Sequence, residues 1–227
     1  MDALERLAGP ASDLLALVDR ALARSGAPDA HPVWPLLRRV GALPGVAVGA
    51  IAELRPAPLA AGGPSLRTLA EGYAEASAAA TIHAPTGTTG RALMVDSGGW
   101  QGMAAEAFAA RWSALSAHLA GGVDSLSARL ETTAAYAESI ASWMARTRGA
   151  VAETLARVLT SAEAVAVVTG PAGAGWFGAE WPAPPAARAH ADIAAAVLYP
   201  IARACEQASE LAERWSPRLT ELAYRQR

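Results

Sequence analysis

The chain has 227 residues and a formal net charge of −2, so its length is sufficient to bury a substantial core. Hydrophobic residues make up 52% of the chain and are dominated by alanine, while aromatic residues contribute only 6%. Alanine favours helices over strands, which excludes an all-β fold and predicts an all-α protein. The balanced charge argues against a basic nucleic-acid-binding surface, so no nucleic-acid partner is expected. The single cysteine, Cys205, excludes an intrachain disulfide.

Neither end of the chain nor its interior carries a standard membrane or export signal. The N-terminus lacks a basic start followed by an apolar run, so we expect no signal peptide. The longest uncharged stretch, 164–179, is shorter than a membrane span and contains Pro171. The sequence therefore predicts a soluble protein, which would need a route independent of a signal peptide if it is exported.

The N-terminal part of the chain is predicted to form short helices. Apolar residues at helical spacing predict a helix over 10–24, and the prolines within 32–54 divide that stretch into two short helices. The segment 55–64 reads as a linker because of its proline and glycine content. Ser65 is expected to cap the next helix, which extends to about residue 81.

The central part combines a loop with the longest periodic stretch of the chain. Residues 83–99 are rich in glycine and predict a loop with one extended piece at 93–95. From 101 to 167 there is no proline, and between Phe108 and Val158 apolar residues recur close to every 3.5 positions. This spacing predicts a long helical rod whose apolar stripe must be covered by partner helices. Gly121 and Gly122 are expected either to bend the rod or to allow another helix to approach closely. The expected helix–helix interface contains Trp112, Leu115, Leu119, Val123, Leu126, Leu130 and Ile140.

The C-terminal part is predicted to be a second loop, 170–185, followed by a helix over 186–224. Cys205 lies on the apolar stripe of that helix and is expected to be a small core residue, and Pro200 and Pro217 are expected to kink the helix. The loop contains a cluster of aromatic side chains. The cluster consists of Trp176, Phe177 and Trp181. These side chains are expected either to plug the end of the bundle or to form an exposed patch for a partner or a membrane surface.

One short motif opens the periodic stretch. The sequence W-Q-G-M-A-A-E-A-F begins at Trp100, and a glycine at position 102 suits a tight reversal while a large ring can fill the open end of a helix pair. This pattern resembles the WXG100 (ESAT-6-like) family of proteins exported by type VII secretion systems. The matching positions are Trp100, Gly102, Ala104, Ala105 and Phe108.

The resemblance implies a fold, a function and a set of partners. The fold would be an elongated antiparallel helical bundle containing a W-x-G helix-turn-helix hairpin. The function would be non-enzymatic, with no catalytic, cofactor-binding or metal-binding residues. The partner would be another such hairpin, either a second copy or a secretion-system component, in a homo- or hetero-oligomer. The protein would be secreted or lie in the cell envelope, with the cytoplasm as the alternative.

The family's export signal is a tyrosine followed four residues later by an acid. Tyr136 and Tyr199 are instead followed at that distance by Ile140 and Arg203, so the resemblance implies that a partner chain carries the signal. A second W-x-G at 176–178 could repeat the same design. We expect three segments: short helices over 1–60, the hairpin over 61–169, and a loop with a long helix packing on the hairpin over 170–227.

Other functional classes were weighed against this one. The sequence V-D-S-G-G at 95–99 resembles a serine-protease signature, but an all-α chain cannot supply the β-barrels that such a triad requires. The glycine-rich segment 87–91 lacks the lysine of a phosphate-binding loop. The alternatives that remain are a membrane-active or lipid-handling helical protein, for which membrane contact is expected, and a general helical scaffold.

Overall fold

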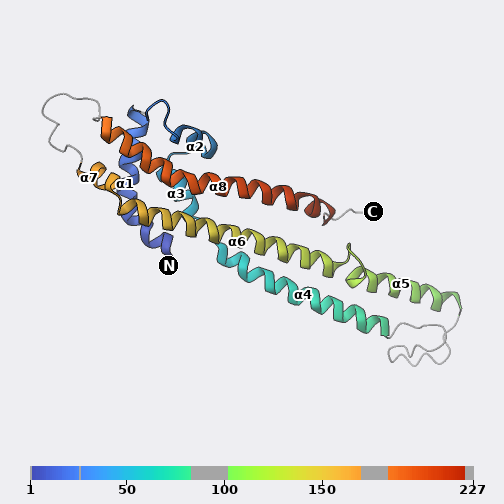
Figure 1. Cartoon of the computed structure of the whole chain (residues 1–227). Coiled ribbons are helices and arrows are strands. Elements are labelled where there is room, and N and C mark those ends of the chain that lie inside the picture. Colours follow the sequence, from blue (N-terminus) through green and yellow to red (C-terminus); the bar gives the residue numbers. More distant parts are fainter. Residues whose placement is uncertain (1, 26, 83–101, 170–183, 223–227) are drawn as a thin grey trace. The chain divides into compact units, whose positions relative to one another are not determined.

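The computed structural model describes residues 2–25, 27–82, 102–169 and 184–222, and all regular structure in these ranges is helical (Figure 1). The all-α prediction is therefore confirmed for the described part of the chain. The helices are α1 Ala3–Ser25, α2 Val33–Val40, α3 Pro44–Ala52, α4 Pro56–Ile82, α5 Met103–Ala120, α6 Leu126–Leu159, α7 Ala162–Thr169 and α8 Pro184–Leu222. The predicted loop at 83–99, with its extended piece at 93–95, lies outside the described residues, as does the predicted loop 170–185 up to residue 183, while Pro184 and Pro185 already belong to α8.

The helices form two compact units. The first contains Met1–Pro56 and Ser142–Ala212, and the second contains Ala57–Ala141 and Glu213–Arg227. Helices α6 and α8 contribute residues to both units. Each unit therefore contains residues from more than one of the three segments expected from the sequence, 1–60, 61–169 and 170–227.

The first unit is built around α1. Its apolar residues recur at helical spacing, and Leu4, Leu15 and Val18 are almost completely buried. They belong to one hydrophobic core with residues of α6 and α8, including Leu155 and Leu198, which are both fully buried. Burial of each such side chain contributes about 1.5–3 kcal/mol before the entropic cost of folding is counted.

Helix α1 begins seven residues earlier than the predicted start at Pro10. The Asp2 carboxylate accepts a hydrogen bond from the Glu5 backbone N–H at 2.9 Å, and the Glu5 carboxylate accepts one from the Asp2 N–H at 3.2 Å. This reciprocal arrangement is a capping box, which satisfies backbone donors at a helix N-terminus. The two short helices expected within 32–54 are confirmed as α2 and α3, with Pro44 at the first position of α3.

The N-terminus of α3 is held by a side chain of α1. The Asp19 carboxylate accepts hydrogen bonds from the Gly45 backbone N–H at 3.1 and 3.2 Å. A methyl group on Gly45 would lie 2.7 Å from an Asp19 oxygen, so only glycine fits this approach. Burial raises the pKa of Asp19, while the hydrogen bond from Gly45 opposes that rise.

The second unit differs from the sequence prediction at its first helix. The segment 55–64, which was expected to be a linker, is helical, because α4 begins at Pro56. Proline at the start of a helix removes only N–H groups that have no intrahelical acceptor, so this residue is compatible with a first turn. Ser65 consequently lies inside the helix, where its hydroxyl donates to the Ala61 carbonyl at 3.3 Å, and the predicted cap is wrong.

The predicted rod over 108–158 is broken between α5 and α6, and a further break follows its end, between α6 and α7. Between α5 and α6 the chain turns at 121–125, and Ser125 then caps α6 by accepting a hydrogen bond from the Ala128 N–H at 3.3 Å. Between α6 and α7, the Ser161 hydroxyl caps α7 by accepting a hydrogen bond from the Ala164 N–H at 3.1 Å. Gly121 and Gly122 indicate the first of these breaks in the sequence, and Ser125 and Ser161 cap the helices that begin after each break.

Helix α8 also departs from its prediction in one respect. The helix continues through Pro200 and Pro217 to Leu222. Cys205 is exposed, whereas Ala204 beside it is buried. The expectation that Cys205 is a core residue is therefore wrong, because the buried face of α8 lies one position away.

Candidate interaction face

Helix α4 packs against α5 and α6 through a row of small residues. Gly63, Ala70 and Ser77 are spaced by seven and are all buried, so they occupy one face of α4. A Cβ on Gly63 would lie 2.6 Å from a Glu138 oxygen. Ser116 of α5, which contacts Ser77, is also small and buried, and α6 carries further small buried residues: Ser127, Ala134 and Ala141. We call these residues the small-residue seam.

Two polar contacts cross this seam and set the direction of the helices. The Ser77 hydroxyl lies 2.8 Å from the Ser116 carbonyl, and the Ser116 hydroxyl donates to the Ser77 carbonyl at 3.1 Å. Arg67 pairs with Glu138, with one nitrogen–oxygen distance of 2.6 Å, and this pairing lowers the pKa of Glu138. Arg67 precedes Ser77 along the chain, whereas its partner Glu138 follows Ser116, the partner of Ser77. Helix α4 therefore runs antiparallel to α5 and α6 (Figure 1).

The residues of the W-x-G motif are described in part. Trp100 lies outside the described residues, and Gly102 has a φ of 93°, a left-handed conformation that favours glycine. Helix α5 begins directly after it, so Ala104 and Ala105 lie in its first turn. Phe108 is 45% exposed and stacks on Trp112, with ring centroids 5.8 Å apart.

The predicted helix–helix interface is divided between α5, the following turn and α6. Leu115 is 50% exposed and Val123 is 85% exposed. The other residues of that prediction are half-buried: Trp112, Leu119, Leu126, Leu130 and Ile140. The periodicity therefore predicted an apolar stripe, but the contact between α4 and α5 uses the small-residue seam beside it.

Large apolar residues of α4 and α5 lie on the same side of the pair. Leu69 and Tyr73 are 54% and 38% exposed, and they stand at i−1 and i+3 from the buried Ala70. Leu115 and Leu119 stand at the same offsets from the buried Ser116. Two antiparallel helices are related by an approximate two-fold axis perpendicular to the plane that contains both helix axes. Residues at the same offset from the contact residue of each helix therefore project from the same side of that plane. We call Leu66, Leu69, Tyr73, Phe108, Trp112, Leu115 and Leu119 the apolar face.

The carboxylates of this helix pair lie on the opposite side. Glu71 stands one residue after Ala70 and is rotated by about 100° from the seam, in the sense opposite to Leu69. Glu75 lies one turn further along the same side. On α5, the exposed Glu106 is rotated from Ser116 in that same sense. The α4–α5 pair thus has an apolar side, flanked by the exposed Arg111, and a polar side on which Arg67 lies with the three carboxylates.

A third helix completes the second unit. Trp215 of α8 is 6% exposed and packs against Tyr136 of α6, with ring centroids 5.4 Å apart. The guanidinium of Arg218 lies 5.3 Å from the centre of the Trp215 ring, a cation–π contact. Because these contacts use the far side of α6, they leave the apolar face of α4 and α5 exposed.

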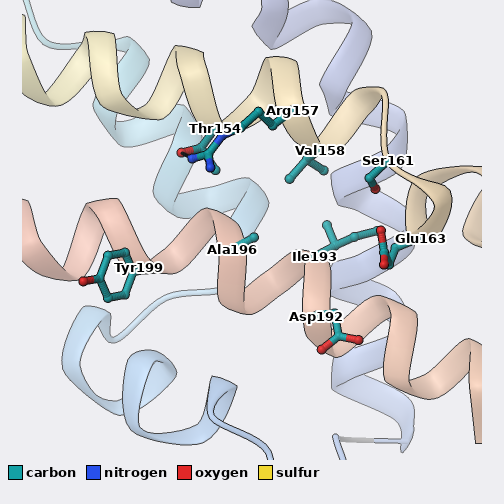
Figure 2. A pocket seen from close by; sticks show the side chains of 9 residues that line it. All are labelled: Thr154, Arg157, Val158, Ser161, Glu163, Asp192, Ile193, Ala196 and Tyr199. Carbon is teal, nitrogen blue, oxygen red and sulfur yellow. Dashed lines mark hydrogen bonds between the residues drawn. The ribbon is translucent and has the colours of Figure 1, made fainter.

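The first unit contains an open pocket of about 440 Å³ between α6 and α8 (Figure 2). Four of the polar side chains that line it, those of Thr154, Arg157, Ser161 and Asp192, bind within the protein. Arg157 donates to the Thr154 hydroxyl at 3.3 Å, and Asp192 accepts from His31 at 3.0 Å. The Ser161 hydroxyl accepts from the backbone of α7. These contacts stabilise helix ends and helix pairs.

Within residues 2–25, 27–82, 102–169 and 184–222, no three histidine, cysteine or acidic residues are grouped so that they could hold a metal ion. No single described helix has the length and apolar character to span a membrane. The bent pair Val33–Val40 and Pro44–Ala78 meets that test only by length and composition.

The aromatic cluster of Trp176, Phe177 and Trp181 lies outside the described residues, as does the second W-x-G at 176–178. Comparison of the chain with protein families, with curated proteins and with solved structures found no match.

Proposed function

We propose that this chain is a non-enzymatic, WXG100-like helical protein associated with type VII secretion, acting as an exported partner or an export adaptor through helix–helix contacts. The observation that carries the proposal is the geometry at the motif. Gly102 has a positive φ directly before α5, a conformation that favours glycine, and α5 runs antiparallel to α4. Both features support the proposal, and α4 ends at Ile82, twenty residues before Gly102.

The apolar face supports a function in protein binding. Leu69 and Leu115 are each at least half exposed on the same side of one helix pair. Contiguous exposed apolar side chains rimmed by polar residues mark interaction sites in soluble proteins. A helical partner that covers this face would remove these side chains from water and would supply the free energy of binding.

A membrane surface is the alternative partner, and the charge pattern argues against it. Amphipathic helices that bind anionic lipids carry lysine or arginine on their polar side. The polar side of the α4–α5 pair instead carries Glu71, Glu75 and Glu106, and its arginine, Arg67, is paired with Glu138. We therefore expect anionic liposomes to bind the protein weakly or not at all.

Export from a bacterium with a type VII secretion system tests the proposal. We expect the protein, co-expressed with its genomic neighbours, to reach the culture medium or envelope and to remain in the cytoplasm when the secretion ATPase is deleted. Export that is unchanged by the deletion, or no export with any neighbour, would overturn the proposal.

A matched pair of glycine variants examines the motif itself. Gly102→Val places a β-branched residue at a φ of 93°, which is strongly disfavoured, so we expect reduced export. Gly122→Val is the control, because a Cβ there meets no atom within 4 Å and its φ is not positive. Equal export of the two variants would count against a role for the reversal.

A further inference from the structure

We infer that the groove between α6 and α8 binds the phosphate group of a small ligand. A second pocket, of about 350 Å³, adjoins the pocket of Figure 2, and the two share four lining residues: Thr154, Arg157, Ala196 and Tyr199. We call this second pocket the arginine pocket. All its lining residues belong to the first unit, so the inference does not depend on the proposed function, which concerns the motif and the second unit.

Arginine side chains line the arginine pocket from both helices. Arg146 and Arg157 come from α6 and Arg203 comes from α8, whereas Glu153 is the one carboxylate that lines it. The lining therefore has an excess of positive charge, although the whole chain has a net charge of −2. Like charges around one pocket repel each other, and an anion bound between them offsets that repulsion.

The three guanidiniums retain hydrogen-bond donors for such an anion. Within the described ranges, no carboxylate lies at ion-pair distance from Arg146. Arg203 lies 3.6 Å from one oxygen of Glu206, but the other oxygen of that carboxylate pairs with an arginine of α2. Arg157 is bent back along α6 (Figure 2), and one of its nitrogens donates to the Thr154 hydroxyl at 3.3 Å. A guanidinium has five N–H donors, so most of these donors remain available.

A buried hydroxyl beside the guanidiniums also lacks a partner. Thr147 is 4% exposed and lines the arginine pocket, and its hydroxyl has no hydrogen-bond partner among the residues that the structure describes. Buried polar groups are nearly always paired in folded proteins. An unpaired hydroxyl at a pocket therefore points to a polar group that comes from outside the chain.

The donor set and the shape of the groove indicate the class of ligand. A phosphate monoester carries a charge of about −2 and three acceptor oxygens, so it can bind arginines of two helices at once. The rest of the ligand would lie toward the exposed ring of Tyr199 and the adjoining pocket. The exposed Glu163 at that pocket disfavours a second anion there. We therefore expect a ligand with one phosphate end and an uncharged remainder.

Isothermal titration calorimetry of the full chain with pyrophosphate, at about 20 mM salt, tests the phosphate end of the site. We expect one site per chain, with a dissociation constant of about 10 µM to 1 mM that weakens as salt is added. Arg146→Met should weaken binding by about tenfold or more, because it removes hydrogen bonds from a charged donor. Glu153→Gln should strengthen binding by about threefold, because it removes the carboxylate that repels the anion.

The matched controls make the same changes of charge at exposed positions of α8 that do not line the pocket: Arg214→Met and Glu210→Gln. Both should bind pyrophosphate as the wild type does, and circular dichroism should give equal helix content for all variants. A wild type that binds no pyrophosphate at about 10 mM would overturn the inference. Equal affinities of Arg146→Met and Arg214→Met would also overturn it. If Arg146→Met loses helix content, the comparison of Glu153→Gln with Glu210→Gln decides.

Vesicles of phosphatidylcholine and phosphatidic acid separate two sources of the phosphate group. Vesicle binding that Arg146→Met abolishes and Arg214→Met retains would assign the group to a lipid headgroup. Binding of pyrophosphate without binding of vesicles would assign it to a soluble compound. We expect the second result, because the exposed Glu153 and Glu163 beside the groove would face an anionic membrane surface.

Discussion

The guanidinium of Arg148 lies 2.7 Å from the carboxylate of Asp2, although the two residues are 146 positions apart in the chain. Arg148 is 4% exposed, and its Nη1 also donates to three backbone carbonyls at the end of α3: Ile51 at 3.2 Å, Ala52 at 2.6 Å and Leu54 at 3.0 Å. A single buried cation thereby joins the start of α1, the end of α3 and the middle of α6. Carbonyls at a helix C-terminus carry partial negative charge, which explains why a cation lies there.

Replacement of Arg148 by Met should therefore destabilise the first unit. Loss of hydrogen bonds to a charged group, with backbone carbonyls left unpaired, should lower the free energy of unfolding by about 2–4 kcal/mol. Urea denaturation followed by circular dichroism measures this change. Arg146→Met, an exposed position two residues earlier, is the control and should differ from the wild type by less than about 0.5 kcal/mol. Equal midpoints for the two variants would contradict the assigned role.

The same contact predicts a dependence of stability on pH. The hydrogen bond from Arg148 lowers the pKa of Asp2 from 3.8 to about 2. The folded state therefore binds fewer protons, and the stabilisation is fully present above about pH 4 and is lost as the pH falls toward 2. Asp2→Asn should be less stable than the wild type at pH 6, and this difference should shrink between pH 4 and 2. A difference that stays constant over this interval would contradict the prediction.

The fit of Gly45 against Asp19 predicts opposite effects for two alanine substitutions in α3. Gly45→Ala places a methyl group 2.7 Å from an Asp19 oxygen and should destabilise the protein by about 1–3 kcal/mol. Gly49→Ala meets no atom within 4 Å and should stabilise it by up to about 1 kcal/mol, since alanine is the better helix former. Thermal unfolding of both variants measures the contrast. Similar shifts in Tm would show that Asp19 does not restrict this position.

The small-residue seam predicts a contrast within α4. Ala70 is fully buried, so Ala70→Leu should force α4 away from its partners and lower the stability of the second unit by about 1–3 kcal/mol. Ala74→Leu lies at an exposed position of the same helix and should be nearly neutral. Hydrogen exchange of the α5 amides reports on the second unit alone. Equal protection in the two variants would contradict close packing at this seam.

Local chemistry accounts for the parts of the fold that were predicted correctly. Alanine content favoured helices throughout, and Pro44 separated α2 from α3 because proline is accepted at the first position of a helix. Leu14, Leu15, Val18 and Leu22 shared one face of a helix by spacing alone, and they are buried in the structure. The residues of the apolar stripe were likewise recognised, since a period near 3.5 depends only on side-chain type.

What the sequence determined by itself was therefore the helical class and the apolar face of each helix. The tertiary structure decided which residues touch. Periodicity shows that Leu115 and Ser116 stand side by side on α5, but it does not show that Ser116 faces Ser77 while Leu115 stays half exposed. Helices joined by small residues approach closely, and this approach, which only the folded chain defines, displaces the large side chains to one side. Sequence spacing likewise did not decide which residue of α8 is buried, since Ala204 lies in the core and Cys205 beside it is exposed.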